Sequence, residues 1–96
     1  MIDKRNIANI LIANKSRLVS KYHLKSIGIF GSLTREDFTE DSDIDILIDY
    51  EQPLGIEFID LANELERILN HKVDLVSKNG VKPKYFKEIQ KDLIYV

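Results

Sequence analysis

The chain has 96 residues, a formal net charge of −2 and no cysteine. We expect one domain with a single core, because a chain of this length buries only about 60–65% of its unfolded surface. The lack of cysteine excludes a disulfide framework and thiolate metal sites. The first residues do not form an uninterrupted apolar run, so no signal peptide or membrane span is predicted, and the cytoplasm is the expected location.

Acidic and basic residues are unevenly distributed along the chain. Residues 36–66 contain twelve Asp or Glu and no Lys or Arg, whereas the other segments hold all fourteen basic residues and four acids. Most of these charges are expected to form an ordinary solvated surface. Crowded carboxylates repel one another, however, and divalent cations relieve that repulsion. The charge balance argues against direct nucleic-acid binding, which would require a net basic face.

The spacing of apolar residues predicts an α+β (mixed α/β) fold, with a small mixed β-sheet and helices packed on it. Asp3 is expected to cap the first helix and Ser32 a short second one. The expected elements are a helix over 3–22, a strand over 25–30, a short helix from Leu33, a strand over 42–50, a helix over 56–69, a strand over 72–76, a helix from Pro83 to about Lys91 and a short edge strand over 94–96.

The strand over 42–50 carries a pair of acids in an otherwise apolar pattern. Its isoleucines alternate with acidic residues, which predicts that Asp43 and Asp45 point away from the core on a common face. Their Cα atoms then lie roughly 6.5–7 Å apart, so the carboxylates can converge on one hard cation or bridge two. Mg²⁺ prefers a few carboxylates together with substrate phosphate oxygens, which fits this pattern. The alternative is a pair of solvated surface charges.

A third acid lies on the next predicted strand. Asp74 is the only acid in the strand over 72–76. If that strand lies beside the strand over 42–50, Asp74 can join the other two carboxylates and complete a metal site. The alternative is an edge-strand charge that discourages association between sheets.

Gly31 and Ser32 follow the strand over 25–30. Glycine lets the backbone approach a ligand closely, and the serine hydroxyl lies where a helix start favours anions. A plain strand-to-helix turn with a serine cap is the alternative. Arg35 can reach a phosphate, which makes it a candidate nucleotide contact, or it can pair with Asp37 or another nearby acid.

The histidines and three of the tyrosines give weaker signals. His23 and His71 stand alone at the ends of predicted elements, so we expect surface positions rather than roles as ligands or bases. Tyr50, Tyr85 and Tyr95 are expected to pack against the protein rather than to form a stacking platform.

Together these motifs resemble the signature of the DNA polymerase β-type nucleotidyltransferase superfamily, and in particular its minimal members, the MntA-like antitoxins. The signature is Gly-Ser, ten residues and Asp-x-Asp, which matches Gly31-Ser32 and Asp43-Ile44-Asp45. The family's third acid lies on a later strand and corresponds to Asp74. The resemblance covers essentially the whole chain. Glu36 departs from it, because many members have glycine after the arginine that corresponds to Arg35.

The resemblance implies Mg²⁺-dependent transfer of AMP from ATP to a hydroxyl, with two ions in the site and pyrophosphate as the second product. Gly31 and Ser32 would then cradle the triphosphate. Asp43 and Asp45 would ligate both ions. Asp74 would ligate the catalytic ion and help deprotonate the acceptor hydroxyl.

The acceptor is expected to come from another protein chain. Few residues remain for an acceptor site once the catalytic sheet is built, so a partner or a second copy must supply it. Minimal family members adenylylate a tyrosine of a HEPN-domain toxin, and the resemblance implies the same partner here. Two alternatives remain: a non-catalytic antitoxin that masks the toxin, and nucleotidyl transfer to a small molecule. The last is disfavoured because the chain has no room for a domain that binds small molecules.

Overall fold

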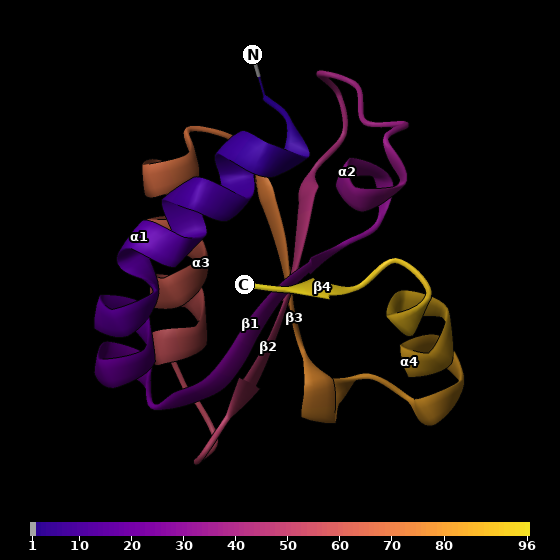
Figure 1. Ribbon diagram of the computed structural model, residues 1–96. Helices are drawn as coiled ribbons and strands as arrows, with labels where there is room; N and C mark the ends of the chain where they lie inside the picture. Colours follow the sequence, from indigo (N-terminus) through magenta and orange to yellow (C-terminus); the bar gives the residue numbers. More distant parts are fainter. Residues whose placement is uncertain (1) are drawn as a thin grey trace.

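The computed structural model describes residues 2–96, and the order of elements in this part of the chain is the predicted one (Figure 1). A 3₁₀ helix between β3 and α4 is an addition that the patterns did not predict. No helix within residues 2–96 is both long and apolar enough to cross a membrane. The elements are α1 (Lys4–Tyr22), β1 (Leu24–Phe30), α2 (Ser32–Arg35), β2 (Ile44–Tyr50), α3 (Glu57–Leu69), β3 (Val73–Ser77), η1 (Lys78–Gly80), α4 (Pro83–Gln90) and β4 (Ile94–Tyr95).

The strands form one mixed sheet in the order β3-β2-β1-β4. β1 runs antiparallel to both of its neighbours, whereas β2 and β3 are parallel. The carboxyl end of β1 therefore lies at the same end of the sheet as the amino ends of the other three strands. This topology brings Gly31, Asp43 and Asp74 to one end of the sheet, and it confirms the predicted α+β class.

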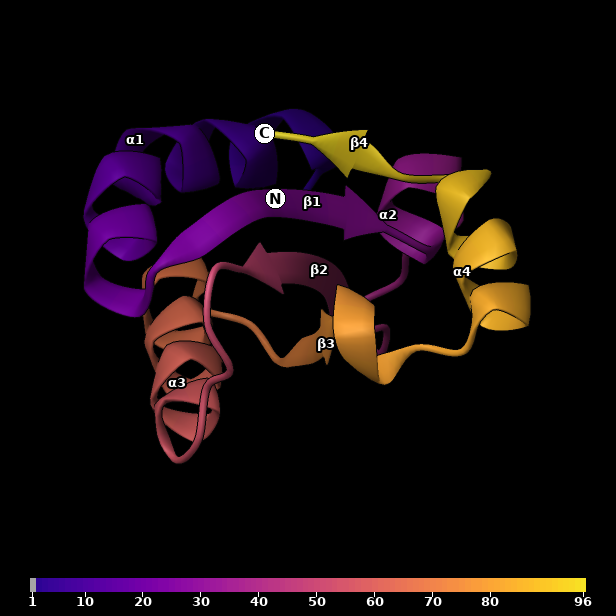
Figure 2. The ribbon, with the colours of Figure 1, turned by 90° about the horizontal axis from the view of Figure 1, so that it is seen from below.

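The two faces of the sheet are covered differently. α1 and α3 lie together on one side of the strands, and α4 lies on the other (Figures 1 and 2). The isoleucines of β2 point toward α1 and α3 and are fully buried, because they alternate along the strand as the sequence predicts. The core between the sheet and these helices is formed by Leu11, Leu18, Ile44, Ile46, Ile48, Leu61 and Leu65, among others.

A buried carboxylate also joins the two core helices. Glu64 of α3 is only 9% exposed, and its Oε1 accepts hydrogen bonds from Arg17 at 3.0 Å and Lys21 at 3.2 Å, both on α1. Arg67 approaches the same oxygen at 3.7 Å. Burial alone would raise the pKa of Glu64, but the hydrogen bonds from Lys21 and Arg17 hold it below its usual value. This acid is therefore compensated by three basic side chains.

Local details confirm some predictions and correct others. Asp3 caps α1 as expected, with its Oδ1 accepting the backbone N–H of Asn6 at 2.8 Å. Tyr85 and Tyr95 are exposed, so the prediction that they pack is wrong. The reason is that α4 has no buried residue and β4 is an edge strand. Tyr50 is partly buried against the core, as predicted.

Candidate active site

Three acids lie close together at the end of the sheet where β2 and β3 begin. Asp45 and Asp74 are direct register partners on these parallel strands, so their side chains leave the same face of the sheet. Asp43 immediately precedes β2, two residues before Asp45, and is exposed. The predicted adjacency of the two strands is thus confirmed. That the three carboxylates ligate metal stays a prediction.

The negative charges of these three acids are not fully compensated by nearby basic side chains. The pKa of Asp45 is raised to about 6, first because the carboxyl is partly buried, and then because Asp74 and Asp43 repel its charged form. Arg35 opposes this shift without cancelling it. A divalent cation would remove the repulsion and favour the ionised form.

The donor set fits a hard divalent cation, although the side chains are not closed around one. Within residues 2–96, no three His, Cys, Asp or Glu side chains are gathered closely enough to hold a metal ion. Asp43 and Asp74 are exposed, so both carboxylates can turn toward an ion without disturbing the core. Carboxylate oxygens are the ligands that Mg²⁺ prefers, and substrate phosphate and water would complete its shell.

Gly31 places the end of β1 directly against the Asp45 carboxylate. Its φ of 76° and ψ of −149° suit glycine, and a Cβ at this position would collide with the Asp45 side chain. Gly31 is also the N-cap of α2, and no side chain caps that helix. The prediction that Ser32 caps α2 is therefore wrong, because Ser32 is its first residue. Gly31 therefore allows the backbone to approach the acids closely.

Arg35 is held by two acids near this site. Its Nη1 donates to Asp92 Oδ2 at 2.8 Å, and its Nε donates to Asp37 Oδ2 at 3.4 Å. The alternative of pairing with nearby acids is thus realised, and contact of Arg35 with a phosphate stays a prediction. A hollow of about 280 Å³ lies beside Arg35 and Asp92, and its other lining residues are Phe30, Gly31, Asp45, Glu88 and Ile89.

His71 supports the loop that precedes β2. Its ring Nε2–H donates to the carbonyl oxygen of Ser42 at 2.6 Å, and the ring centroid lies 5.3 Å from that of Phe38. The histidine is partly buried, and the sequence did not predict this contact. Because Ser42 directly precedes Asp43, this contact helps to fix the position of the backbone from which the Asp43 side chain projects. The only feature of the sequence that could have indicated this role is the position of His71 just before β3.

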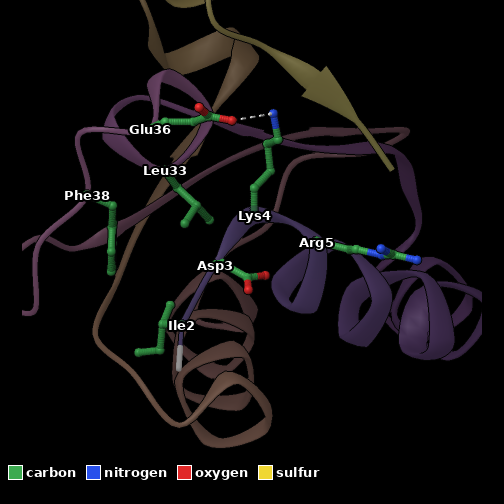
Figure 3. A pocket seen from close by; sticks show the side chains of 7 residues that line it. All are labelled: Ile2, Asp3, Lys4, Arg5, Leu33, Glu36 and Phe38. Carbon is green, nitrogen blue, oxygen red and sulfur yellow. Dashed lines mark ion pairs between the residues drawn. The ribbon is translucent and has the colours of Figure 1, made fainter.

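Larger hollows exist elsewhere and are lined differently. One of about 370 Å³ lies at the start of α1, with apolar walls that include Ile2, Leu33 and Phe38 (Figure 3). Its Lys4 and Glu36 already pair with each other at 3.7 Å. Its other acid, Asp3, caps α1, so both of its acids are engaged, and we take Asp45 and its neighbours as the candidate reactive centre despite their smaller hollow.

Comparison with known proteins agrees with this geometry. The family model for the nucleotidyltransferase domain matches residues 12–96. The chain belongs to this nucleotidyltransferase family. The nucleotidyltransferase is 49% identical over 92 residues to MJ0126 of Methanocaldococcus jannaschii, a candidate protein adenylyltransferase, with 94% of each chain covered. It is 39% identical to protein adenylyltransferase MntA of Thermococcus cleftensis over 97 aligned positions, which cover 100% of this chain and 98% of that one.

Solved structures share the fold of this nucleotidyltransferase. The structure of a candidate minimal nucleotidyltransferase matches with a TM-score of 0.82 and 28% identity, covering 97% of this chain and 95% of that one. A crystal structure of a toxin–antitoxin with AMP-PNP matches with a TM-score of 0.74 and 26% identity, covering 91% of this chain and 69% of that one. The protein is thus an MntA-like minimal nucleotidyltransferase, and the predicted enzyme class is confirmed.

Proposed function

We propose that this nucleotidyltransferase transfers AMP from ATP to a hydroxyl of a partner toxin and is the antitoxin of a toxin–antitoxin pair. The register pairing of Asp45 with Asp74, directly beside Gly31, carries the proposal. The adenylyltransferase names of the relatives and the toxin–antitoxin structure with AMP-PNP support ATP as the donor. The chain acts as one catalytic domain.

In the proposed reaction, each residue has a task that follows from its position. Asp43 and Asp45 hold Mg²⁺, which supplies positive charge against the phosphates when bound. Gly31 and Ser32 bring backbone and hydroxyl groups to the triphosphate. The acceptor oxygen forms a bond to the α-phosphorus as the bond to the β-phosphate oxygen breaks, and pyrophosphate leaves. Asp74 receives the proton of the acceptor hydroxyl.

A macromolecular acceptor fits the exposure of the site. Asp74 is exposed on β3, which is an edge strand, so a hydroxyl on another protein can reach it. A tyrosine of a HEPN-type toxin is the proposed acceptor, as the family resemblance implies.

The test is transfer of label from [α-³²P]ATP to a HEPN-type toxin that binds this protein. The doubly substituted Asp43→Asn/Asp45→Asn protein should lose at least about a hundredfold in transfer rate, because two metal ligands are removed. Asp49→Asn on the same strand is the matched control and should transfer normally.

Thermal melting would establish that both variants fold. Absence of label on a toxin that binds the wild-type protein would reject the proposal. Full protection of cells by the doubly substituted protein would show instead that masking the toxin is sufficient.

A further inference from the structure

The Arg35–Asp92 ion pair joins segments that are 57 positions apart in the chain. It ties α2, which follows β1, to the turn between α4 and β4. Asp92 is the better partner of this arginine, because its bond is 2.8 Å long and its side chain is 21% exposed. Asp37, at 3.4 Å, is 62% exposed.

Both residues of this pair line the hollow beside the candidate acids. Gly31 and Asp45 line the hollow from the sheet, whereas Glu88 and Asp92 line it from the α4 segment. Arg35 of α2 lines the same hollow. Its effect on the pKa of Asp45 indicates that the guanidinium is within electrostatic reach of that carboxylate. Arg35 is therefore close enough to meet a phosphate group bound there.

The α4 segment is weakly packed, whereas the strand that follows it is anchored. No residue of α4 is buried. By contrast, β4 pairs with β1 through Gly28 and Ile29, and a Cβ at Gly28 would come within 2.7 Å of Leu93 Cδ1. Leu93 thus fits where the glycine leaves space. The sheet therefore holds β4, whereas no buried side chain holds α4.

We propose that Asp92 is a built-in competitor of the nucleotide phosphates: it holds Arg35 in the absence of ATP and is displaced when the polyphosphate binds. This inference rests on the proposed function, because it assigns nucleotide binding to the same site. A guanidinium binds phosphate oxygens bidentately, and a polyphosphate carries more negative charge than one carboxylate. Transfer of Arg35 from Asp92 to phosphate releases α4 and widens the hollow.

The test is a titration of a fluorescent ATP analogue with Mg²⁺ at constant ionic strength. Asp92→Asn should bind the analogue about two- to fivefold more tightly than the wild type, the range expected for loss of a partly exposed ion pair. Arg35→Gln should bind more weakly. In the Arg35→Gln background, Asp92→Asn should have no further effect, because the two side chains act as one unit.

Two matched controls separate this competition from a general loss of negative charge. Asp37→Asn removes the other acid that contacts Arg35, and Glu88→Gln removes another acid from the same hollow. Neither should reproduce the gain of Asp92→Asn. Hydrogen exchange gives a second readout: ATP should increase amide exchange over residues 83–90 of the wild type, and Asp92→Asn should show this faster exchange before ATP is added.

An unchanged or weaker affinity of Asp92→Asn overturns the inference, as does an equal gain in the Arg35→Gln background or the absence of binding in every variant. Transfer of AMP to the toxin at saturating ATP, measured on the same proteins, separates the two proposals. If transfer occurs without the expected affinity pattern, only the competition by Asp92 is wrong. If the affinity pattern occurs and no protein transfers AMP, only the proposed function is wrong.

Discussion

Two partly or fully buried acids in this protein have opposite surroundings. Glu64, between α1 and α3, is surrounded by three basic side chains, and hydrogen bonds keep its pKa low despite burial. Asp45, on the other face of the sheet, has two acids as neighbours, and its pKa is raised to about 6. Burial penalises the charged form of both carboxyl groups. Only the neighbouring charges explain why the pKa values move in opposite directions.

The difference distinguishes a charge that stabilises the fold, that of Glu64, from a charge that is open to a ligand, that of Asp45. Basic residues of its own chain compensate the charge of Glu64 at its Oε1 and contribute to holding two helices together. Asp45 is left with excess negative charge at an open end of the sheet, where a cation from solution can compensate it. The chain uses its own basic residues to compensate the buried acid of the core, and we propose that an external ion compensates the acids around Asp45.

Loss of the Glu64 charge should destabilise the protein. Glu64→Gln removes an ionic acceptor that binds Arg17 and Lys21, and we expect a loss of about 1–2 kcal/mol in the free energy of unfolding. Because folding lowers the pKa of Glu64, its stabilisation is present above the unfolded pKa and is lost as the pH falls through the folded pKa. Urea unfolding at pH 7 and at successively lower pH would measure both effects.

The exposed Glu51→Gln substitution is the control and should change stability by less than about 0.5 kcal/mol. An equally stable Glu64→Gln protein would contradict a stabilising role for this charge cluster.

The matched change at Asp45 should have the opposite sign and a smaller size. Asp45→Asn removes a carboxylate that its neighbours repel, and we expect a gain of about 0.5–1 kcal/mol at pH 7 without divalent ions. Because the folded pKa is raised, the wild type loses stability as the pH rises through about 6, and the variant should not show this loss. Asp49→Asn serves as the control in the same unfolding experiment. A loss of stability in Asp45→Asn would show that the acids do not repel one another.

The sequence pattern predicted the fold, and it predicted which face of β2 the acids occupy, for a physical reason. Alternation along β2 determines which side chains reach each face, so the residue pattern alone separates Asp43 and Asp45 from the isoleucines. The position of Asp74 depended on strand order, which alternation does not determine. The observed parallel register supplied that missing information.

Other features of the site depend on contacts between distant segments. Asp92 pairs with Arg35 across 57 positions, and His71 reaches Ser42 across 29. The local pattern of residues in the sequence cannot predict such pairs, because they form only when the sheet brings strand ends together. The cap of α2 was predicted incorrectly for a different reason: the glycine conformation, rather than a serine side chain, starts that helix.

The most direct test is a titration of the Asp45 carboxyl carbon by NMR, without and with Mg²⁺. If uncompensated acids form a cation site, the carboxyl group should titrate near pH 6 without the ion, and Mg²⁺ should move its midpoint toward lower pH. A midpoint close to the ordinary value of 3.8 that does not respond to Mg²⁺ would contradict this account.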